Sequence, residues 1–372
     1  MASSQKLPSP GGRGLREGGT TDYPTPSPPP SPFKGEGEMG AMESWIVGII
    51  LLVIKLGVIL VVLLLAAAYL VWVERKLIGR LQVRYGPNRA GWFGLLQPLA
   101  DLIKLVTKED TVPGAADKTI FLLAPAVVAT TAMLIIAVIP FGNGFMLWGK
   151  PIPMVIADLN VALLFVIALS SLGVYGIALG GWASNSKYSL LGGIRGVAQM
   201  ISYELSLGLS LVPIVMLARS FSLVDIVNAQ ARYPFILVQP VSFLIFLVSA
   251  VAEIKRIPFD LPEAENELVA GYHTEYSGMR FGLFFLGEYI TLIVLGGLIG
   301  AFFLGGWRGP FLPPLAWFIL KVLAMVFVMI WVRGTLPRLR YDQLMSVGWK
   351  VLIPVALLNI MVTGAVILMI GP

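Results

Sequence analysis

The chain has 372 residues, of which 57% are hydrophobic and 13% charged, and its mean hydropathy is +0.83. It has no cysteine and a single histidine, which excludes disulfides, thiolate metal sites, cysteine-ligated iron–sulfur clusters and bis-histidine haem within the chain. The formal net charge is +6, but the basic residues lie in short segments between apolar runs, where they set membrane orientation rather than bind nucleic acid. We therefore expect an all-α integral membrane protein, a bundle of about eight transmembrane helices with no bound metal and no nucleic-acid partner.

Residues 1–44 are rich in proline, glycine and serine and cannot bury apolar surface, which predicts a disordered tail. Met39 and Met42 come just before the first apolar run, so the tail is interpreted as a possible start-site artefact. Residues 45–372 are expected to form one polytopic membrane domain.

Eight apolar segments follow the tail, each near the length of about 20 residues that a helix needs to cross a bilayer. They are expected near residues 46–73, 119–140, 157–180, 196–218, 235–252, 281–305, 314–332 and 350–370.

The loops between these segments carry their lysines and arginines unevenly. Loops near 74–118, 181–195, 253–280 and 333–349 hold seventeen of these residues, counting Lys350 at the margin, against four in the loops between them. Because cytoplasmic loops are enriched in basic residues, these four loops are predicted to be cytoplasmic and both termini periplasmic.

The first cytoplasmic loop contains an amphipathic pattern. Its apolar face is formed by Leu95, Leu99, Leu102, Ile103 and Val106, and its polar face by Gln97, Asp101, Lys104 and Lys108. This spacing predicts a helix that lies on the membrane surface. The helix could be a passive anchor, or one wall of an entrance for a lipid-like substrate with Glu74 and Arg75 at its mouth.

The third cytoplasmic loop is the most unusual part of the sequence. It holds the single histidine, His273, and six of the 21 carboxylates, namely Glu253, Asp260, Glu263, Glu265, Glu267 and Glu275. Placing ionisable groups beside lipid costs free energy, so a functional role is the first interpretation. The alternative is a solvated loop whose acids keep it in water.

Two glutamates, Glu204 and Glu288, lie inside predicted spans near their cytoplasmic ends. Grouped with Glu253 and the loop acids, they could form a buried relay in which desolvation and mutual repulsion raise several carboxyl pKa values towards neutrality. For Lys55, Asp158 and Lys321, which can reach the ends of their spans, structural pairing is an equally good interpretation. The cations of residues 333–350 could dock an acidic partner protein, although setting orientation explains them better.

Several stretches carry a family resemblance. ERKLIGRLQVRYGPNRAGWFGLLQPLADLIK, GWASNSKYSLLGGIRGVAQMISYELSLGL, PFDLPEAENELVAGYHTEYSGMRFGLFFLGEY and PRLRYDQLMSVGWK resemble the H subunit of bacterial NADH–quinone oxidoreductase (respiratory complex I), the counterpart of subunit 1 of mitochondrial complex I. The resemblance extends from about Trp45 onward. Membrane subunits of energy-converting [NiFe] hydrogenases are relatives that match these loops less completely.

The resemblance implies a quinone chamber and a proton path, with no catalytic residue of this chain acting directly on the quinone. The implied quinone-binding residues are Glu74, Arg75, Asp101, Lys104 and Arg256. The implied proton path consists of Glu204, Glu253, Glu263, Glu265, Glu267 and Glu288. Rearrangement of the loop at 253–280, which is punctuated by prolines and glycines, would couple the two.

The resemblance also implies a subunit that is inactive alone, in the bacterial inner membrane. Its expected partners are the peripheral quinone-site and iron–sulfur subunits, small membrane subunits, antiporter-like subunits and membrane lipid. Quinone would be the substrate, with FMN and iron–sulfur clusters on partner subunits and no cofactor on this chain. A hydrogenase membrane subunit and a stand-alone ion transporter remain as alternatives.

Overall fold

The computed structural model describes the backbone of residues 38–147 and 150–370. Residues 1–37 of the expected tail at 1–44 therefore lie outside the described residues. Residues 38–44 belong to the first helix. The chain divides into two compact units, residues 1–51 and 52–372. The described part of the first unit is the opening of one helix, and the arrangement discussed below is that of the second unit.

Most of the described residues are helical, as predicted. The α-helices are α1 Glu38–Leu81, α2 Gln97–Thr107, α3 Lys118–Ile135, α4 Ala162–Ala183, α5 Lys187–Ala218, α6 Leu223–Ala229, α7 Phe235–Val238, α8 Pro240–Glu253, α9 Glu265–Leu268, α10 Gly278–Phe303, α11 Pro314–Thr335, α12 Tyr341–Ser346 and α13 Ile353–Ile370. Three short 3₁₀ helices are η1 Trp92–Gly94, η2 Ile136–Val138 and η3 Gly271–His273, and η4 Val347–Leu352 is a π-helix. Strands β1 Phe145–Leu147 and β2 Lys150–Ile152 form a short antiparallel hairpin.

Seven helices within the described residues are long and apolar enough to cross a membrane. They fall on seven of the eight predicted spans, and the eighth prediction, near 235–252, corresponds to α7 and α8. Proline removes an N–H and disfavours helical geometry in the preceding residue. Gln239, which precedes Pro240, accordingly leaves the helical region with φ −127° and ψ 57°. The predicted fifth span is therefore broken, and α8 contains only 14 residues.

The predicted surface helix is present as α2. It begins at Gln97 with Pro98 in its opening turn, and no residue in it is buried within the chain. An apolar face left open by the protein is suited to the membrane interface.

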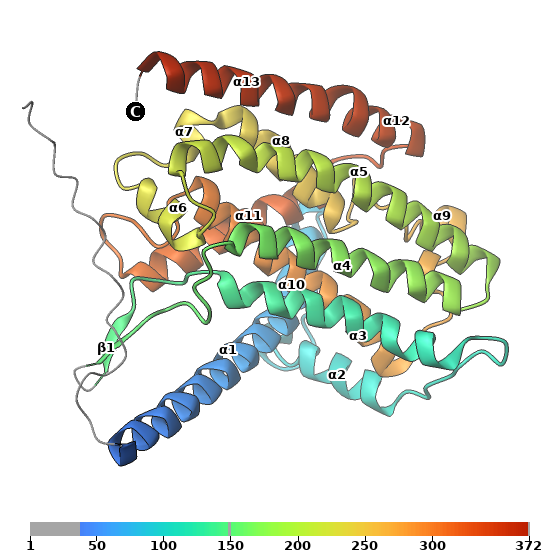
Figure 1. Cartoon of the computed structure of the whole chain (residues 1–372). Helices are drawn as coiled ribbons and strands as arrows, with labels where there is room; N and C mark the ends of the chain where they lie inside the picture. The colour runs from blue at the N-terminus through green and yellow to red at the C-terminus, as the bar shows by residue number, and fades with distance from the viewer. Residues whose placement is uncertain (1–37, 148–149, 371–372) are drawn as a thin grey trace, which may run out of the picture. The chain divides into compact units, whose positions relative to one another are not determined.

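Helix α10 forms the centre of the core. It packs against α3, α8 and α11. Of its most apolar 18-residue stretch, 67% is buried within the chain. Helices α3, α4 and α5 run side by side, and α8 and α13 both pack on α5 (Figure 1). A helix that is apolar all round needs such cover on every side. Glu288, the one acid in α10, is therefore enclosed by protein.

Two lysines in the spans bind backbone oxygens. Lys321 Nζ donates to the carbonyls of Leu304, Gly306 and Arg308 at 2.6, 2.8 and 2.7 Å. Lys55 Nζ donates to the carbonyl of Pro153 at 2.7 Å. Both contacts fit the structural interpretation, because they satisfy carbonyls at helix ends and turns.

Candidate functional site

Close backbone packing fixes the loop between α8 and α10. Gly271 has φ +60°, and a Cβ there would lie 1.7 Å from the carbonyl oxygen of Pro262. A Cβ at Gly192 in α5 would lie 2.6 Å from the backbone nitrogen of Tyr272. Glycine allows the chain to approach at both points. The loop therefore presses η3 against α5 and buries Tyr272 and His273.

A buried ion cluster ties four segments together. Arg256 Nη1 lies 2.5 Å from Glu74 Oε2, and Arg256 Nε contacts Glu288 Oε1. Arg333 Nη1 contacts the other oxygen of Glu74. The Arg256 guanidinium also lies over the Tyr289 ring, at 4.4 Å from its centroid. Glu74 comes from α1, Glu288 from α10 and Arg333 from α11, so the cluster joins residues from both ends of the sequence.

Burial makes this cluster sensitive to change. Side-chain exposure is 6% for Arg256, 6% for Glu288 and 4% for Glu74. Removing one partner of such a cluster leaves an uncompensated charge in a medium that solvates it poorly. Arg256 was assigned to the quinone site and Glu288 to the proton path, and their contact brings these two predicted groups together.

A second polar group lies beside this cluster. Lys255 Nζ donates to the Tyr272 hydroxyl at 3.4 Å, and that hydroxyl donates to Glu263 Oε1 at 3.1 Å. Burial, aided by the charge of Glu288, raises the pKa of Glu263 to about 8. This is the shift towards neutrality that was expected for the acids of the loop.

The single histidine is part of the same region. His273 stacks on Phe281, with ring centroids 5.3 Å apart, and is buried. Burial and then the charge of Lys255 lower the pKa of His273 to about 4. The imidazole is therefore neutral at physiological pH.

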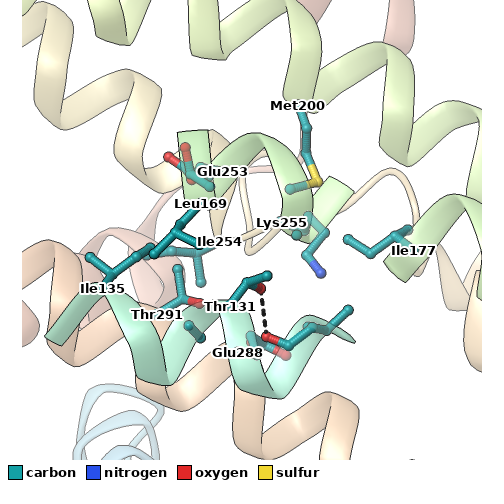
Figure 2. A pocket seen from close by; sticks show the side chains of 14 residues that line it. Thr131, Ile135, Leu169, Ile177, Met200, Glu253, Ile254, Lys255, Glu288 and Thr291 are labelled. Carbon is teal, nitrogen blue, oxygen red and sulfur yellow. Dashed lines mark hydrogen bonds between the residues drawn. The ribbon is translucent and has the colours of Figure 1, made fainter. Parts of the chain in front are cut away.

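Two small cavities open among these side chains. One, of about 50 Å³, is lined by Glu253, Lys255 and Glu288 together with hydroxyl and apolar side chains of α3, α4, α5 and α10. Figure 2 shows its labelled lining, with Thr131 and Thr291 near Glu288. The other, of about 130 Å³, has a mostly polar and charged lining: Lys255, Arg256, Ile257, Asp260, Glu263, Ala270, His273, Phe285, Glu288 and Arg333. Polar cavities of this size hold water molecules in proteins.

Glu204 reaches the smaller cavity through a hydroxyl. Its Oε1 accepts from Ser170 Oγ at 3.1 Å and also from Ser171 Oγ. Ser170 and Glu253 both line that cavity. The structure thus brings Glu204, Glu253, Glu263 and Glu288 close to a shared pair of cavities.

The remaining predicted residues lie apart from the buried cluster. Arg75 Nη1 pairs with Asp101 Oδ2 at 2.9 Å, which links α1 to α2, and Lys104 is exposed on α2. Glu267 pairs with Arg195 at 2.5 Å and is half exposed. The Arg195 hydrogen bond lowers the pKa of Glu267. The Glu265 side chain lies outside the described residues, and the roles of all these residues remain predictions.

Sequence reasoning did not assign three residues that complete the site. Lys255, Tyr272 and Arg333 all contact or face the predicted acids. The adjacent pair Lys255–Arg256 inside an acid-rich segment was a usable signal, because buried acids need cationic partners. Arg333 was assigned to orientation, and its contact with Glu74 spans 259 positions of sequence.

The described fold and its buried charges define a polytopic helical membrane protein with an ion cluster beside internal cavities. The family model described as NADH dehydrogenase matches residues 54–364. A relative in Syntrophobacter fumaroxidans, the second of its NADH-quinone oxidoreductase H subunits, is 72% identical over 330 residues, covering 89% of this chain and 100% of the relative. The protein of the same name in Geobacter sulfurreducens is 67% identical, covering 84% and 95%. The NADH-quinone oxidoreductase H subunit of Syntrophotalea carbinolica is 63% identical, covering 87% and 98%. The chain belongs to this NADH dehydrogenase family, the family of the H subunits.

Proposed function

We propose that the chain is the quinone-site and coupling subunit of a proton-translocating NADH–quinone oxidoreductase. Its family membership and the names of its relatives support this assignment. The chain is then one subunit of an enzyme complex and is inactive alone. Quinone is its substrate, and FMN and iron–sulfur clusters are held by partner subunits.

The quinone side of the site is formed by Glu74, Arg75, Asp101, Lys104 and Arg256. The unburied helix α2 supports this proposal, because its open apolar face can receive an isoprenoid tail from the bilayer. The Arg75–Asp101 pair joins this helix to α1, one residue from the buried Glu74. Among the described residues, Arg256 Nη2 is buried without a hydrogen-bond partner, and Arg256 lines the larger cavity, which leaves a donor for water or ligand.

The proton side consists of Glu204, Glu253, Glu263, Glu265, Glu267 and Glu288. The observation that carries the proposal is the position of Glu288, which pairs with Arg256 and lines both cavities. A change of charge near Arg256 would alter the field at Glu288 and shift the protonation of the acids around it. Rearrangement of the loop at 253–280 would then link quinone reduction to proton movement.

The assembly follows from the same assignment. We place the chain in the bacterial inner membrane with both termini on the periplasmic side, as the lysine and arginine distribution indicates. Its partners are the peripheral quinone-site and iron–sulfur subunits, small membrane subunits and antiporter-like subunits. The membrane domain is proposed to begin near residue 45, inside helix α1, which starts at Glu38.

The test replaces one acid from each cavity in the assembled complex. In native membranes, Glu253→Gln and Glu263→Gln should each lower NADH-driven proton uptake by about ten-fold or more, because each removes a titratable group from the path. Quinone reduction and proton uptake are measured together, and NADH oxidation by a soluble artificial acceptor reports assembly of the flavin-binding partner.

Glu275→Gln is the matched control, since Glu275 lies in the same loop but outside the two cavity linings described above. It should behave as the wild type. Proton uptake at the wild-type rate in both Glu253→Gln and Glu263→Gln would refute the coupling role. Absence of the flavin and iron–sulfur subunits from complexes pulled down through this chain would refute the assignment itself.

A further inference from the structure

Lys255 occupies an unusual position between the two cavities. It follows the end of α8 with a left-handed backbone, φ 61°, and only 6% of the residue is exposed. Lys255 and Glu288 are the two residues that line both cavities. Figure 2 shows the Lys255 side chain in the cavity, between Met200, Ile177 and Thr131. An ionisable group at such a boundary is in contact with both compartments.

The contacts of Lys255 differ from those of its neighbour. Arg256 is held by Glu74 and Glu288 in direct ion pairs. Lys255 Nζ instead donates to the neutral Tyr272 hydroxyl at 3.4 Å and lies 5.0 Å from the centroid of that ring. A long hydrogen bond to a neutral group stabilises an ammonium ion less than a close carboxylate does.

Charged and titratable groups surround Lys255 in the two cavities. The acids are Glu253 at the end of α8, Asp260 and Glu263 in the loop and Glu288 on α10; the cations are Arg256, next in sequence, and Arg333 on α11; and Tyr272 and His273 on η3 are neutral. Burial lowers the pKa of Lys255, whereas the carboxylates of Glu263, Glu288 and Glu253 oppose this shift. The protonation of Lys255 therefore depends on how many of these acids are charged.

We propose that Lys255 is a proton-exchanging residue that connects the larger cavity, on the Glu263 side, with the smaller cavity, on the Glu253 side. This inference rests on the proposed function and adds to it a basic group between the acids. The route to Glu263 passes through Tyr272, whose hydroxyl accepts from Lys255 and donates to Glu263. The route to Glu253 passes through the cavity that both residues line.

The proton balance is simple. In one half of the cycle the ammonium gives one proton to the water or carboxylate on one side and becomes a neutral amine. In the other half the amine takes one proton from the other side and becomes an ammonium again. No bond other than N–H and O–H bonds changes, and no electron is transferred. Arginine cannot perform this exchange, because its guanidinium stays protonated in proteins.

The alternative role for Lys255 is a fixed positive charge that holds the acids together, and two substitutions separate the roles. Lys255→Arg keeps the charge and removes the exchange, whereas Lys255→Met removes both. If Lys255 exchanges protons, both variants should lower NADH-driven proton uptake about ten-fold or more. If it is a fixed charge, Lys255→Arg should restore most of the activity.

The measurement uses native membranes in which the variant chain replaces the wild type. Proton uptake is followed by the quenching of a pH-sensitive acridine dye, and electron flow by NADH oxidation with a short-chain quinone. NADH oxidation by hexaammineruthenium(III) reports assembly. Lys187→Met is the matched control, since Lys187 is an exposed lysine at the start of α5, and it should leave all three rates unchanged.

Each outcome has one meaning. Proton uptake within two-fold of wild type in Lys255→Arg, or in an assembled Lys255→Met complex, would overturn the inference. If neither variant assembles, Tyr272→Phe decides, because it removes only the hydroxyl that bridges Lys255 and Glu263. It should lower proton uptake, and unchanged uptake would overturn the inference. Wild-type membranes that lack quinone-linked NADH oxidation would instead overturn the proposed function, and this inference with it.

Discussion

Arg256 directs two of its nitrogens at two different carboxylates. Nη1 lies 2.5 Å from Glu74 and Nε contacts Glu288, while the guanidinium carbon lies over the Tyr289 ring, 4.4 Å from its centroid. The planar guanidinium group of arginine can make these contacts at the same time, whereas the ammonium group of a lysine cannot. The residue therefore holds α1, α10 and the loop after α8 in one arrangement.

Replacement of Arg256 should destabilise the protein strongly. Arg256→Met leaves Glu288 without its closest cation and Glu74 with Arg333 alone, at an expected loss of about 3–5 kcal/mol for a broken buried ion pair. Arg256→Lys should recover only part of this loss. Two quantities are measured. One is the amount of full-length chain in membranes, and the other is its thermal stability in detergent, which is determined by size-exclusion chromatography of heated samples.

The control is an exposed arginine. Arg308 donates to the Asn228 side chain at 3.0 Å at the surface, so Arg308→Met should leave the amount and stability of the chain close to wild type. Equal behaviour of Arg256→Met and Arg308→Met would show that the buried cluster contributes little to stability.

Helix α5 and the short helix η3 depend on one glycine for their contact. A Cβ at Gly192 would lie 2.6 Å from the Tyr272 backbone nitrogen and 2.8 Å from Gly271. Gly192→Ala must therefore move η3, and overpacking of this kind costs about 1–3 kcal/mol. Because η3 carries Tyr272, we expect this variant to lose thermal stability and to lower proton uptake in assembled membranes.

The same helix offers a matched control. Gly208 also lies in α5, and a Cβ there would meet nothing within 4 Å. Gly208→Ala should be neutral or slightly stabilising, since alanine is the better helix former. A Gly192→Ala chain as stable and active as Gly208→Ala would mean that the η3 contact is not needed for the site.

The elements that could be predicted are those fixed by local patterns. Apolar runs and the spacing around Asp101 and Lys104 predicted the spans and α2, because hydrophobic length and periodicity are properties of neighbouring residues. The break at Gln239 was missed, although Pro240 signals it, because the apolar run continues through the proline. The helix-breaking tendency of this one proline did not outweigh the length of the apolar run in the sequence-based prediction.

The site was predictable only in part, for a related reason. Acids in an apolar chain stand out by composition, so Glu263 and Glu288 could be singled out from the sequence. Their partners depend on tertiary packing: the Arg256–Glu74 contact spans 182 positions and the Arg333–Glu74 contact 259. Local spacing carries no information on such pairs.

At the scale of the whole molecule, the side of the membrane on which each terminus lies depends on whether the short helix α8 crosses the bilayer. At 1.5 Å per residue its 14 residues cover about 21 Å, less than the roughly 30 Å hydrocarbon core of a bilayer. If α7 and α8 together cross the membrane, the chain makes eight crossings and its termini lie on the same side. If they do not, the termini lie on opposite sides, and the lysine and arginine bias no longer follows alternate loops.

Single cysteines on either side of α8 distinguish these arrangements, and the natural absence of cysteine from the chain removes its background labelling. Arg232, before α7, and Asn266, in α9, are both exposed. We expect a membrane-impermeant maleimide to label Arg232→Cys from the periplasmic side in intact cells, and Asn266→Cys only in inverted vesicles, because basic loops stay cytoplasmic. Permeabilised membranes, in which both positions should be labelled, provide the control for access. Labelling of both positions from the same side would show that α8 does not cross the membrane and would refute the predicted orientation.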